Sequence, residues 1–126
     1  MRSDTLGILL LSGSHERTHY AFVLASGAAA LGRRVMVFAS NAGCRALLED
    51  WSGLEAAERD AVVQSRGVAG LDTLREASRE LGVRLIACEA GLRAEALESA
   101  PLFAGVEVAG VATFLEAVGE GVILTI

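Results

Sequence analysis

The chain has 126 residues, 52% of them hydrophobic and 21% charged, with a net charge of −5. This length accommodates one domain with one core, spanning residues 1–126, and the apolar content excludes intrinsic disorder. Two cysteines are too few for the disulfide framework of a small secreted domain. All basic residues are arginines mixed with acidic residues, and aromatic residues are few, so we expect no nucleic-acid partner.

The N-terminal part of the chain carries no recognisable targeting signal. Residues 1–5 run straight into a strand-like segment, which is not typical of a signal peptide with a cleavage site. The longest uncharged stretch near the start, 18–32, falls short of the roughly 18–20 apolar residues that a bilayer requires. We therefore expect a cytoplasmic protein with no membrane span and with reduced thiols.

Hydrophobic patterning predicts strands and helices that alternate along the chain. A continuous apolar run predicts a buried strand at 6–11. The alanine-rich segment 16–31 predicts a helix that is apolar nearly all round, and therefore enclosed rather than half exposed. Residues 50–70 are the least regular part, with room for one short helix. The other expected elements are strands at 35–39, 83–87, 105–108 and 122–126, and helices at 44–49, 71–81, 91–97 and 110–118.

This alternation predicts an α/β fold, a single-domain three-layer α/β/α sandwich with a mainly parallel sheet of about five strands. In such a sheet, ligands bind outside the carboxyl ends of the strands. Small and polar residues follow several of the predicted strands, which leaves room there for a ligand. The candidate substrate-binding residues are Ser12, Gly13, Ser14, Asn41, Glu89 and Gly110.

Cys88 is the candidate catalytic residue. It directly follows a predicted strand and directly precedes a predicted helix. Unpaired amides and the dipole at a helix N-terminus stabilise a thiolate, which is the nucleophilic form of cysteine. Arg93 would add to this effect, and Glu89 would oppose it. The alternative is a buried, inert cysteine that packs as a small hydrophobic side chain.

Cys44 is a possible second thiol. It follows the strand predicted at 35–39, at the same expected edge of the sheet as Cys88, so the two thiols could approach each other across that edge. The alternative is a cysteine that only packs in the core, because nothing except the expected topology brings the two thiols together.

Residues 15–19 match the H-E-x-x-H pattern, in which two histidines one helical turn apart bind zinc and the glutamate activates a water. Here the pattern begins a helix directly after a buried strand, includes an arginine, and has no evident third ligand. A metal-dependent hydrolase using His15, Glu16 and His19 is therefore the less favoured alternative. We expect a solvated helix start capped by Ser14, with neither a metal nor an organic cofactor.

Residues 11–38 contain Leu-Ser-Gly-Ser, an alanine-rich helix and the strand Val-Met-Val-Phe, and residues 82–88 read Gly-Val-Arg-Leu-Ile-Ala-Cys. Residues 105–113 read Gly-Val-Glu-Val-Ala-Gly-Val-Ala-Thr. These three segments resemble the DsrE/DsrF-like family, and residues 105–115, which nearly reproduce its segment Gly-Val-Glu-x-x-Gly-Val-Ala-Thr, are the most specific of the three. The resemblance covers almost the whole chain in the right order, with only residues 50–70 unmatched.

The resemblance implies a compact α/β fold, a homo-oligomer and a role in sulfur transfer. In this family a carrier cysteine receives a sulfane sulfur as a persulfide and passes it on, and Cys88 is the residue that matches it. The resemblance thus implies a sulfur carrier or sulfurtransferase, with sulfur donor and acceptor proteins as partners. No methionine-rich segment and no second cysteine follow Cys88 in the same loop, which argues against a disulfide step within that loop.

The alternative function is a non-catalytic binding or assembly subunit of the same family, in which Cys88 is structural. Either function is compatible with an oligomer. A small chain with few charged residues would expose large apolar patches as a monomer, and such patches usually mark interfaces. Residues 106–115 and 122–126 are the candidates for that contact.

Overall fold

The computed structural model describes residues 4–126, so most of the N-terminal segment considered above as a targeting signal lies outside the described residues. Five strands form one sheet in the order β4-β3-β2-β1-β5, and every neighbouring pair is parallel. The predicted α/β fold is confirmed, with an all-parallel sheet. The strands are β1 (Leu6–Leu10), β2 (Val35–Ala39), β3 (Arg84–Cys88), β4 (Glu107–Ala109) and β5 (Val122–Thr125).

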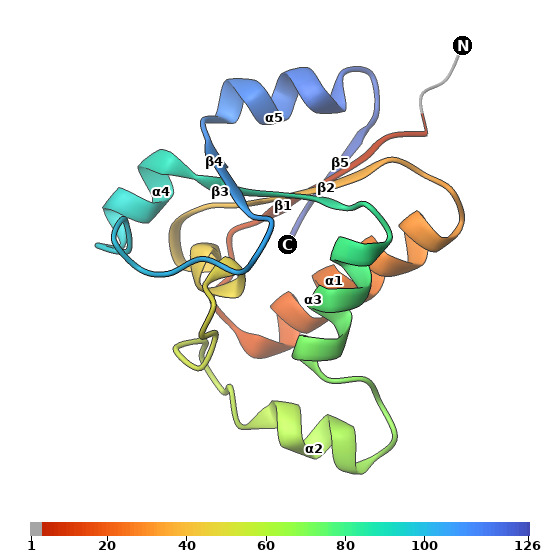
Figure 1. The fold of residues 1–126 in the computed structure, drawn as a ribbon, viewed down its shortest axis with the longest axis vertical. Helices are drawn as coiled ribbons and strands as arrows, with labels where there is room; N and C mark the ends of the chain where they lie inside the picture. The colour runs from red at the N-terminus through yellow and green to blue at the C-terminus, as the bar shows by residue number, and fades with distance from the viewer. Residues whose placement is uncertain (1–3) are drawn as a thin grey trace.

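The helices cover both faces of this sheet (Figure 1). Their bounds are α1 (His15–Ala30), the 3-10 helix η1 (Asn41–Leu47), α2 (Arg59–Ser65), α3 (Leu71–Glu80), α4 (Glu89–Ala94) and α5 (Val111–Val118). None of the helices within residues 4–126 combines the length and the apolarity needed to cross a membrane.

The strand order explains why α5 lies alone on its face. From β1 to β4 the chain adds each strand on the same side of the previous one, and it then crosses back to place β5 on the far side of β1. Because connections between parallel strands are almost always right-handed, a reversal of direction moves the connecting helix to the opposite face. Figure 1 accordingly shows α5 on one side of the sheet and α1 and α3 on the other.

Successive side chains of a strand point to opposite faces of the sheet, so the strands contribute to two hydrophobic cores. Ile8, Val37 and Leu85 belong to the larger core, on the side of α1 and α3. Phe38 and Ile86, from the other face of the sheet, belong to a smaller core completed by α5. A single short helix covers that second face, so much of the apolar surface near the edge of the sheet stays exposed.

Helix α1 is half exposed, and the expectation that it is enclosed is wrong. Phe22 and Ala25 are completely buried, whereas Tyr20 is 58% exposed. The exposed residues of the helix are polar or aromatic in its first half (Glu16, Arg17 and Tyr20) and small in its second half (Gly27 and Ala30). Side chains of this size expose little apolar area, so their exposure costs little free energy. The apolar composition of the segment therefore predicted more burial than the helix has in the structure.

The short helix expected at 44–49 is the 3-10 helix η1, which begins three residues earlier. Asn41 starts it with a φ of 52°, a conformation that few residues other than glycine and asparagine adopt readily. Gly43 follows, and a Cβ at that position would lie 2.1 Å from the carbonyl oxygen of Leu10. The turn after β2 is thus pressed against the end of β1, which only glycine permits.

Other boundaries move by a few residues from those predicted. The strands expected at 83–87 and 105–108 lie at Arg84–Cys88 and Glu107–Ala109, and the helices expected at 91–97 and 110–118 begin at Glu89 and Val111. The change at Glu89 matters most, because it makes Cys88 both the last residue of β3 and the N-cap of α4.

Candidate functional site

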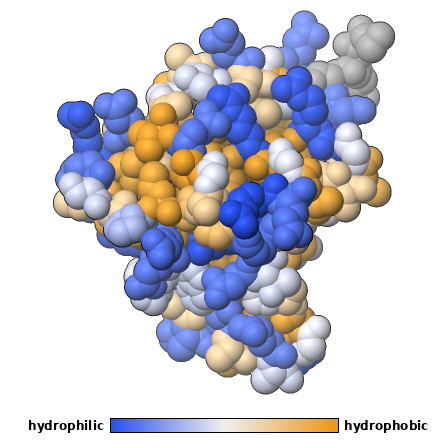
Figure 2. All heavy atoms as spheres, viewed as in Figure 1, coloured by the Kyte–Doolittle hydropathy of each residue, from blue (hydrophilic) through white to orange (hydrophobic). Residues whose placement is uncertain are grey.

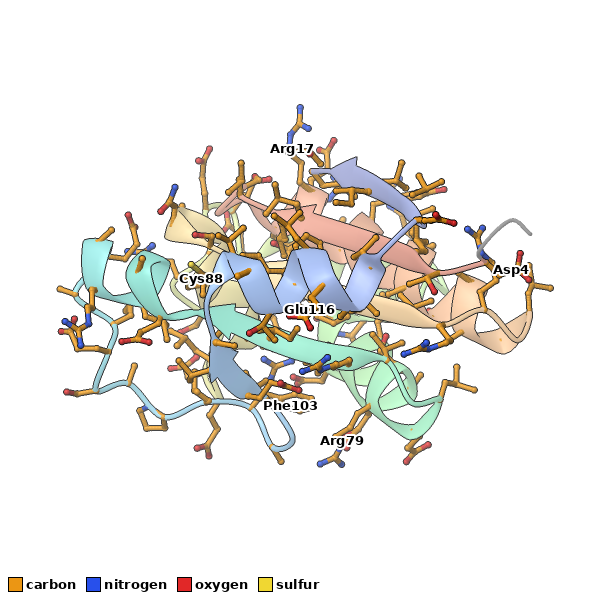
Figure 3. The ribbon with its side chains drawn as sticks, turned by 90° about the horizontal axis from the view of Figure 1, so that it is seen from above. Asp4, Arg17, Arg79, Cys88, Phe103 and Glu116 are labelled. Carbon is orange, nitrogen blue, oxygen red and sulfur yellow. The ribbon has the colours of Figure 1, made fainter. Side chains whose placement is uncertain are left out.

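Cys88 lies at the end of β3, and the helices that follow β3 and β4 lie on opposite faces of the sheet. After β3 the chain enters α4, whose Leu92 packs in the larger core, and after β4 the chain enters α5 on the other face. Cys88 pairs in register with Ala109 of β4, just before α5 begins, and Figure 3 shows it beside that end of α5. Such a switch point opens the crevice in which α/β proteins bind ligands.

The thiol of Cys88 is nearly buried and accepts a backbone hydrogen bond. The residue is 8% exposed and belongs to the same small core as Phe114 and Ala109. Its Sγ accepts the N–H of Gly91 at a distance of 3.4 Å, which caps α4. An N–H donated to sulfur stabilises negative charge on it. The sulfur therefore has a fixed hydrogen-bond donor at the N-terminus of α4.

Gly91 brings this donor under the sulfur because it has no side chain. A Cβ at this position would lie 2.5 Å from the backbone nitrogen of Asn41 and 2.5 Å from Oγ of Ser40. The first turn of α4 is therefore packed directly against the start of η1. A larger residue at position 91 would push α4 away and move the amide that Cys88 uses.

The charged neighbours of Cys88 pair with each other. Arg93 donates to the carboxylate of Glu89 at 3.4 Å, and both side chains are largely exposed on α4. Arg93 is thus not an isolated cation beside Cys88, and its effect on the thiol stays a prediction. The Gly91 amide is the group that donates to the Cys88 sulfur.

Cys44 lies close to the main chain of Cys88 but belongs to the larger core. Its thiol is fully buried and donates to the carbonyl oxygen of Ala39 at 3.5 Å. Burial raises the pKa of Cys44 to about 11, and the neighbouring thiol of Cys88 contributes in the same direction. Cys44 is therefore a neutral thiol at neutral pH.

The other predicted binding residues fall into two groups. Asn41 contacts the α4 turn at Gly91, and Gly110 is the N-cap of α5, so both lie near Cys88 together with Glu89. The remaining three follow β1, which is separated from β3 by β2. These three are Ser12, Gly13 and Ser14. A role in ligand binding stays a prediction for all six.

The hydroxyl groups after β1 hold the loop that leads into α1. Oγ of Ser12 donates to Oγ of Ser14 at 3.1 Å and accepts the backbone N–H of Ser14 at 3.1 Å. Oγ of Ser14 accepts the backbone N–H of Arg17 at 3.2 Å, which confirms Ser14 as the N-cap of α1. Gly13 packs against Ala42, where a Cβ would lie 2.9 Å from the alanine side chain.

The two histidines of the H-E-x-x-H pattern are buried, and the expectation of a solvated helix start is wrong. Nε2 of His15 lies 2.7 Å from Oδ1 of Asp60, and Nε2 of His19 lies 2.7 Å from the carbonyl oxygen of Ala69. Both acceptors require a proton on Nε2, so each histidine uses that nitrogen within the fold. Within residues 4–126, no three His, Cys, Asp or Glu side chains are grouped to hold a metal ion.

Asp60 is the centre of this network, and sequence reasoning missed it. Its carboxylate accepts hydrogen bonds from His15, from the backbone N–H of Leu71 at 2.8 Å and from Gln64 at 2.8 Å. Burial alone would raise the pKa of Asp60, but these hydrogen bonds outweigh it and lower the pKa below its ordinary value. The signal in the sequence was a pair of histidines in a largely apolar helix, which indicates that an acidic partner should be sought elsewhere in the chain.

Glu107, within the most specific family segment, ties β4 to β3. Its carboxylate accepts two hydrogen bonds from the guanidinium of Arg84, at 2.7 and 2.8 Å. These hydrogen bonds lower the pKa of Glu107. The same strand pair holds Ala109 beside Cys88, so Glu107 serves the site by keeping the edge strand in register.

A hollow of about 240 Å³ lies beside α4 and β4. Its lining is mainly apolar with charged residues at the border, namely Glu89, Leu92, Arg93, Leu97, Glu98, Ala100, Leu102 and Val108. Figure 2 shows apolar side chains gathered over β4 and the neighbouring part of α4 on this face.

Comparison with known proteins supports both the fold and the resemblance. The DsrE/DsrF/DrsH-like family model matches residues 48–124, a range that includes the residues 50–70 left unmatched above. Sulfur carrier protein DsrE2 of Allochromatium vinosum is 30% identical over 152 aligned positions, which cover 95% of this chain and 96% of that protein.

Two solved structures have the same fold. The ychN protein of E. coli superposes with a TM-score of 0.67 and 15% identity, covering 100% of each chain. MTH1491 of Methanobacterium thermoautotrophicum, a protein of unknown function, superposes with a TM-score of 0.64 and 18% identity, covering 97% of this chain and 98% of that one.

Proposed function

Because the chain belongs to the DsrE/DsrF/DrsH-like family, we propose that it is a sulfur carrier in which Cys88 holds a sulfane sulfur as a persulfide. The relative from Allochromatium vinosum bears the name of a sulfur carrier protein, and the similarity extends over nearly the full length of both chains. A reducing compartment such as the cytoplasm would keep Cys88 available between transfers.

The observation that carries the proposal is the position of Cys88. Its sulfur ends a parallel strand at the switch point between α4 and α5 and accepts the amide of Gly91. Ligands of α/β proteins bind at such switch points, and the amide gives the sulfur a fixed hydrogen-bond donor.

Loading and unloading are both displacements at sulfur. In loading, the Cys88 thiolate attacks the terminal sulfur of a donor R–S–SH. A bond forms between Sγ and that sulfur, and the donor bond breaks, which leaves Cys88–S–SH and R–S⁻. In unloading, an acceptor thiolate attacks the outer sulfur and Cys88 leaves as the thiolate. This chemistry is that of thiol–disulfide exchange, and it needs no external oxidant.

Incubation with inorganic polysulfide tests the proposal. We expect the chain to gain the mass of one sulfur atom, to carry it on the peptide that contains Cys88, and to lose it on treatment with dithiothreitol. Mass spectrometry of the intact chain and of its peptides measures both. Sulfur bound only at Cys44, or no gain of sulfur, would contradict the proposal and favour a structural subunit.

A homo-oligomer is part of the same proposal. Edge strand β5 is exposed at all of its residues, and three of them are large and apolar. On α5, Val111 is 56% and Leu115 is 52% exposed. A second copy of the chain that covered these surfaces would remove them from water, which is favourable in proportion to the apolar area.

We expect the chain to exceed the mass of a monomer in light scattering at micromolar concentration. The double substitution Leu115→Glu and Ile123→Glu should reduce the mass toward that of a monomer, because it places charges on both surfaces. Leu31→Glu is the matched control, since Leu31 is 84% exposed and follows the last turn of α1, outside the candidate surface. A monomer mass for the unmodified chain at every dilution would refute the oligomer.

A further inference from the structure

Helix α4, which begins directly after Cys88, is a short helix with few buried residues. Of its six residues, only Gly91 and Leu92 are buried. Leu92 packs in the larger core, and Gly91 lies directly against Ser40 and Asn41 at the start of η1. These contacts hold the first part of the helix and leave its last two residues without a buried side chain.

An ion pair between η1 and α4 holds the other end of the helix. Nη1 of Arg45, in η1, donates to Oε1 of Glu95, the C-cap of α4, at 2.6 Å. The two side chains are 29% and 28% exposed, so the pair is partly shielded from water. A short charge-assisted hydrogen bond of this kind is stronger than a neutral one. The 3-10 helix η1 therefore contacts α4 near both of its ends.

The C-cap of α4 is connected to the Cys88 sulfur through a single residue. The backbone N–H of Glu95 donates to the carbonyl oxygen of Gly91 at 3.2 Å, and the N–H of Gly91 donates to the Cys88 sulfur at 3.4 Å. A displacement of the C-cap would therefore be transmitted to the group that contacts the sulfur. Because Cys88 is only 8% exposed, the seating of this turn also determines how readily its thiol is reached.

The turn that follows Glu95 weakens this end of the helix. Ala96 has a φ of 56°, in the left-handed region that a residue with a Cβ disfavours. Glycine is the usual residue at this position after a helix, because it adopts the conformation without strain. The end of α4 thus depends on contacts from outside the helix, and the ion pair between Arg45 and Glu95 supplies one.

We propose that Arg45 and Glu95 are positioning residues for Cys88, because their ion pair seats α4 against η1 and so holds the N–H of Gly91 on the Cys88 sulfur. The inference rests on the proposed function, in which Cys88 carries the sulfur. Without the pair, α4 stays attached through Leu92 but opens more often. The same openings expose the Gly91 amide to solvent and the Cys88 thiol to reagents.

Hydrogen exchange measured by NMR, together with alkylation of Cys88 by iodoacetamide, tests the positioning role without a sulfur donor. We expect Arg45→Gln to speed exchange of the Gly91 amide about threefold, the size of effect typical of a partly exposed ion pair. Alkylation of Cys88, followed on its peptide, should accelerate by a similar factor, since both processes need the same opening. The amide of Ile86, in the middle of β3, should exchange at an unchanged rate.

A double-mutant cycle separates the ion pair from two independent side-chain effects. Glu95→Gln should have the same effect as Arg45→Gln, and the double variant should exchange the Gly91 amide no faster than either single variant. Arg45→Lys should restore most of the slow exchange, because Arg45 donates through one nitrogen and lysine keeps a charge opposite Glu95. Effects that add in the double variant would overturn the inference.

Arg79→Gln is the matched control for the loss of an arginine and its ion pair. Arg79 pairs with Glu76 on α3, a helix that packs against α1. Exchange of the Gly91 amide and alkylation of Cys88 should both match those of the unmodified chain. If Arg45→Gln instead speeds exchange at Ile86 as much as at Gly91, the Arg45–Glu95 pair contributes only to global stability, and the positioning role is refuted.

Polysulfide treatment of the same chains separates this inference from the proposed function. Faster Gly91 exchange and Cys88 alkylation in Arg45→Gln, for a chain that takes up no sulfur, would support the positioning role and refute the carrier function alone. Uptake of sulfur on Cys88 of the unmodified chain, with an unchanged Gly91 exchange rate in Arg45→Gln, would support the carrier function and refute the positioning role alone.

Discussion

Replacing Cys88 with serine should abolish sulfur loading while leaving the fold intact. A serine hydroxyl is not ionised at neutral pH and forms no persulfide, so no residual loading is expected at this position. Serine is also a favourable N-cap, and its oxygen can accept the Gly91 amide that the Cys88 sulfur now accepts. We expect the free energy of unfolding to change by less than about 1 kcal/mol.

The measurement is the gain of sulfur by the intact chain together with a thermal unfolding curve. Cys44→Ser is the control, because it removes the other thiol and should still load one sulfur per chain. Loading that persists in Cys88→Ser would place the carrier sulfur elsewhere. Cooperative unfolding at a much lower temperature in this variant would instead identify Cys88 as a packing residue and remove the basis of the carrier proposal.

The position of Cys88 could be predicted from the sequence, but the reason for its importance could not. A continuous apolar run that stops at a cysteine indicates the end of a buried strand, and parallel strands present their carboxyl ends at one edge. The order of the strands in the sheet cannot be predicted from the local hydrophobic periodicity of the sequence. The switch point between β3 and β4 depends on that order, because it arises from the late return of the chain to β5.

The role of the H-E-x-x-H histidines depends on a long-range contact of the same kind. His15 and Asp60 are 45 residues apart, and Asp60 lies in the segment with the weakest hydrophobic pattern. Periodicity identifies faces of helices and strands, and it contains no information about which polar group will meet a buried histidine. The motif therefore indicated a metal site or solvent exposure, whereas tertiary packing supplies a buried carboxylate partner.

Removal of the Asp60 carboxylate is expected to have the largest effect on stability. Asp60→Ala should lower the free energy of unfolding by about 3 kcal/mol at neutral pH, because it leaves His15 and the Leu71 amide without their acceptor in a buried site. The loss should concentrate where α2 and α3 meet α1. Hydrogen exchange should show it directly, since the Leu71 amide donates to Asp60 and would exchange faster in the variant.

The same carboxylate makes stability depend on pH. The pKa of Asp60 is lowered in the folded state, so the folded chain keeps the carboxylate ionised at pH values where the unfolded chain protonates it. Its contribution is therefore fully present above the ordinary aspartate pKa of about 3.9 and is lost as the pH falls through the lower folded value. Asp60→Ala should lose this part of the pH dependence.

Glu58→Gln separates the buried carboxylate from a general effect of charge in this segment. Glu58 precedes α2, is exposed, and makes no side-chain hydrogen bond as the N-cap of that helix. Urea unfolding of the unmodified chain and of both variants between neutral pH and about pH 3 measures the difference. Equal losses of stability in the two variants, or an unchanged exchange rate of the Leu71 amide in Asp60→Ala, would show that the His15–Asp60 contact does not hold α2 and α3 against α1.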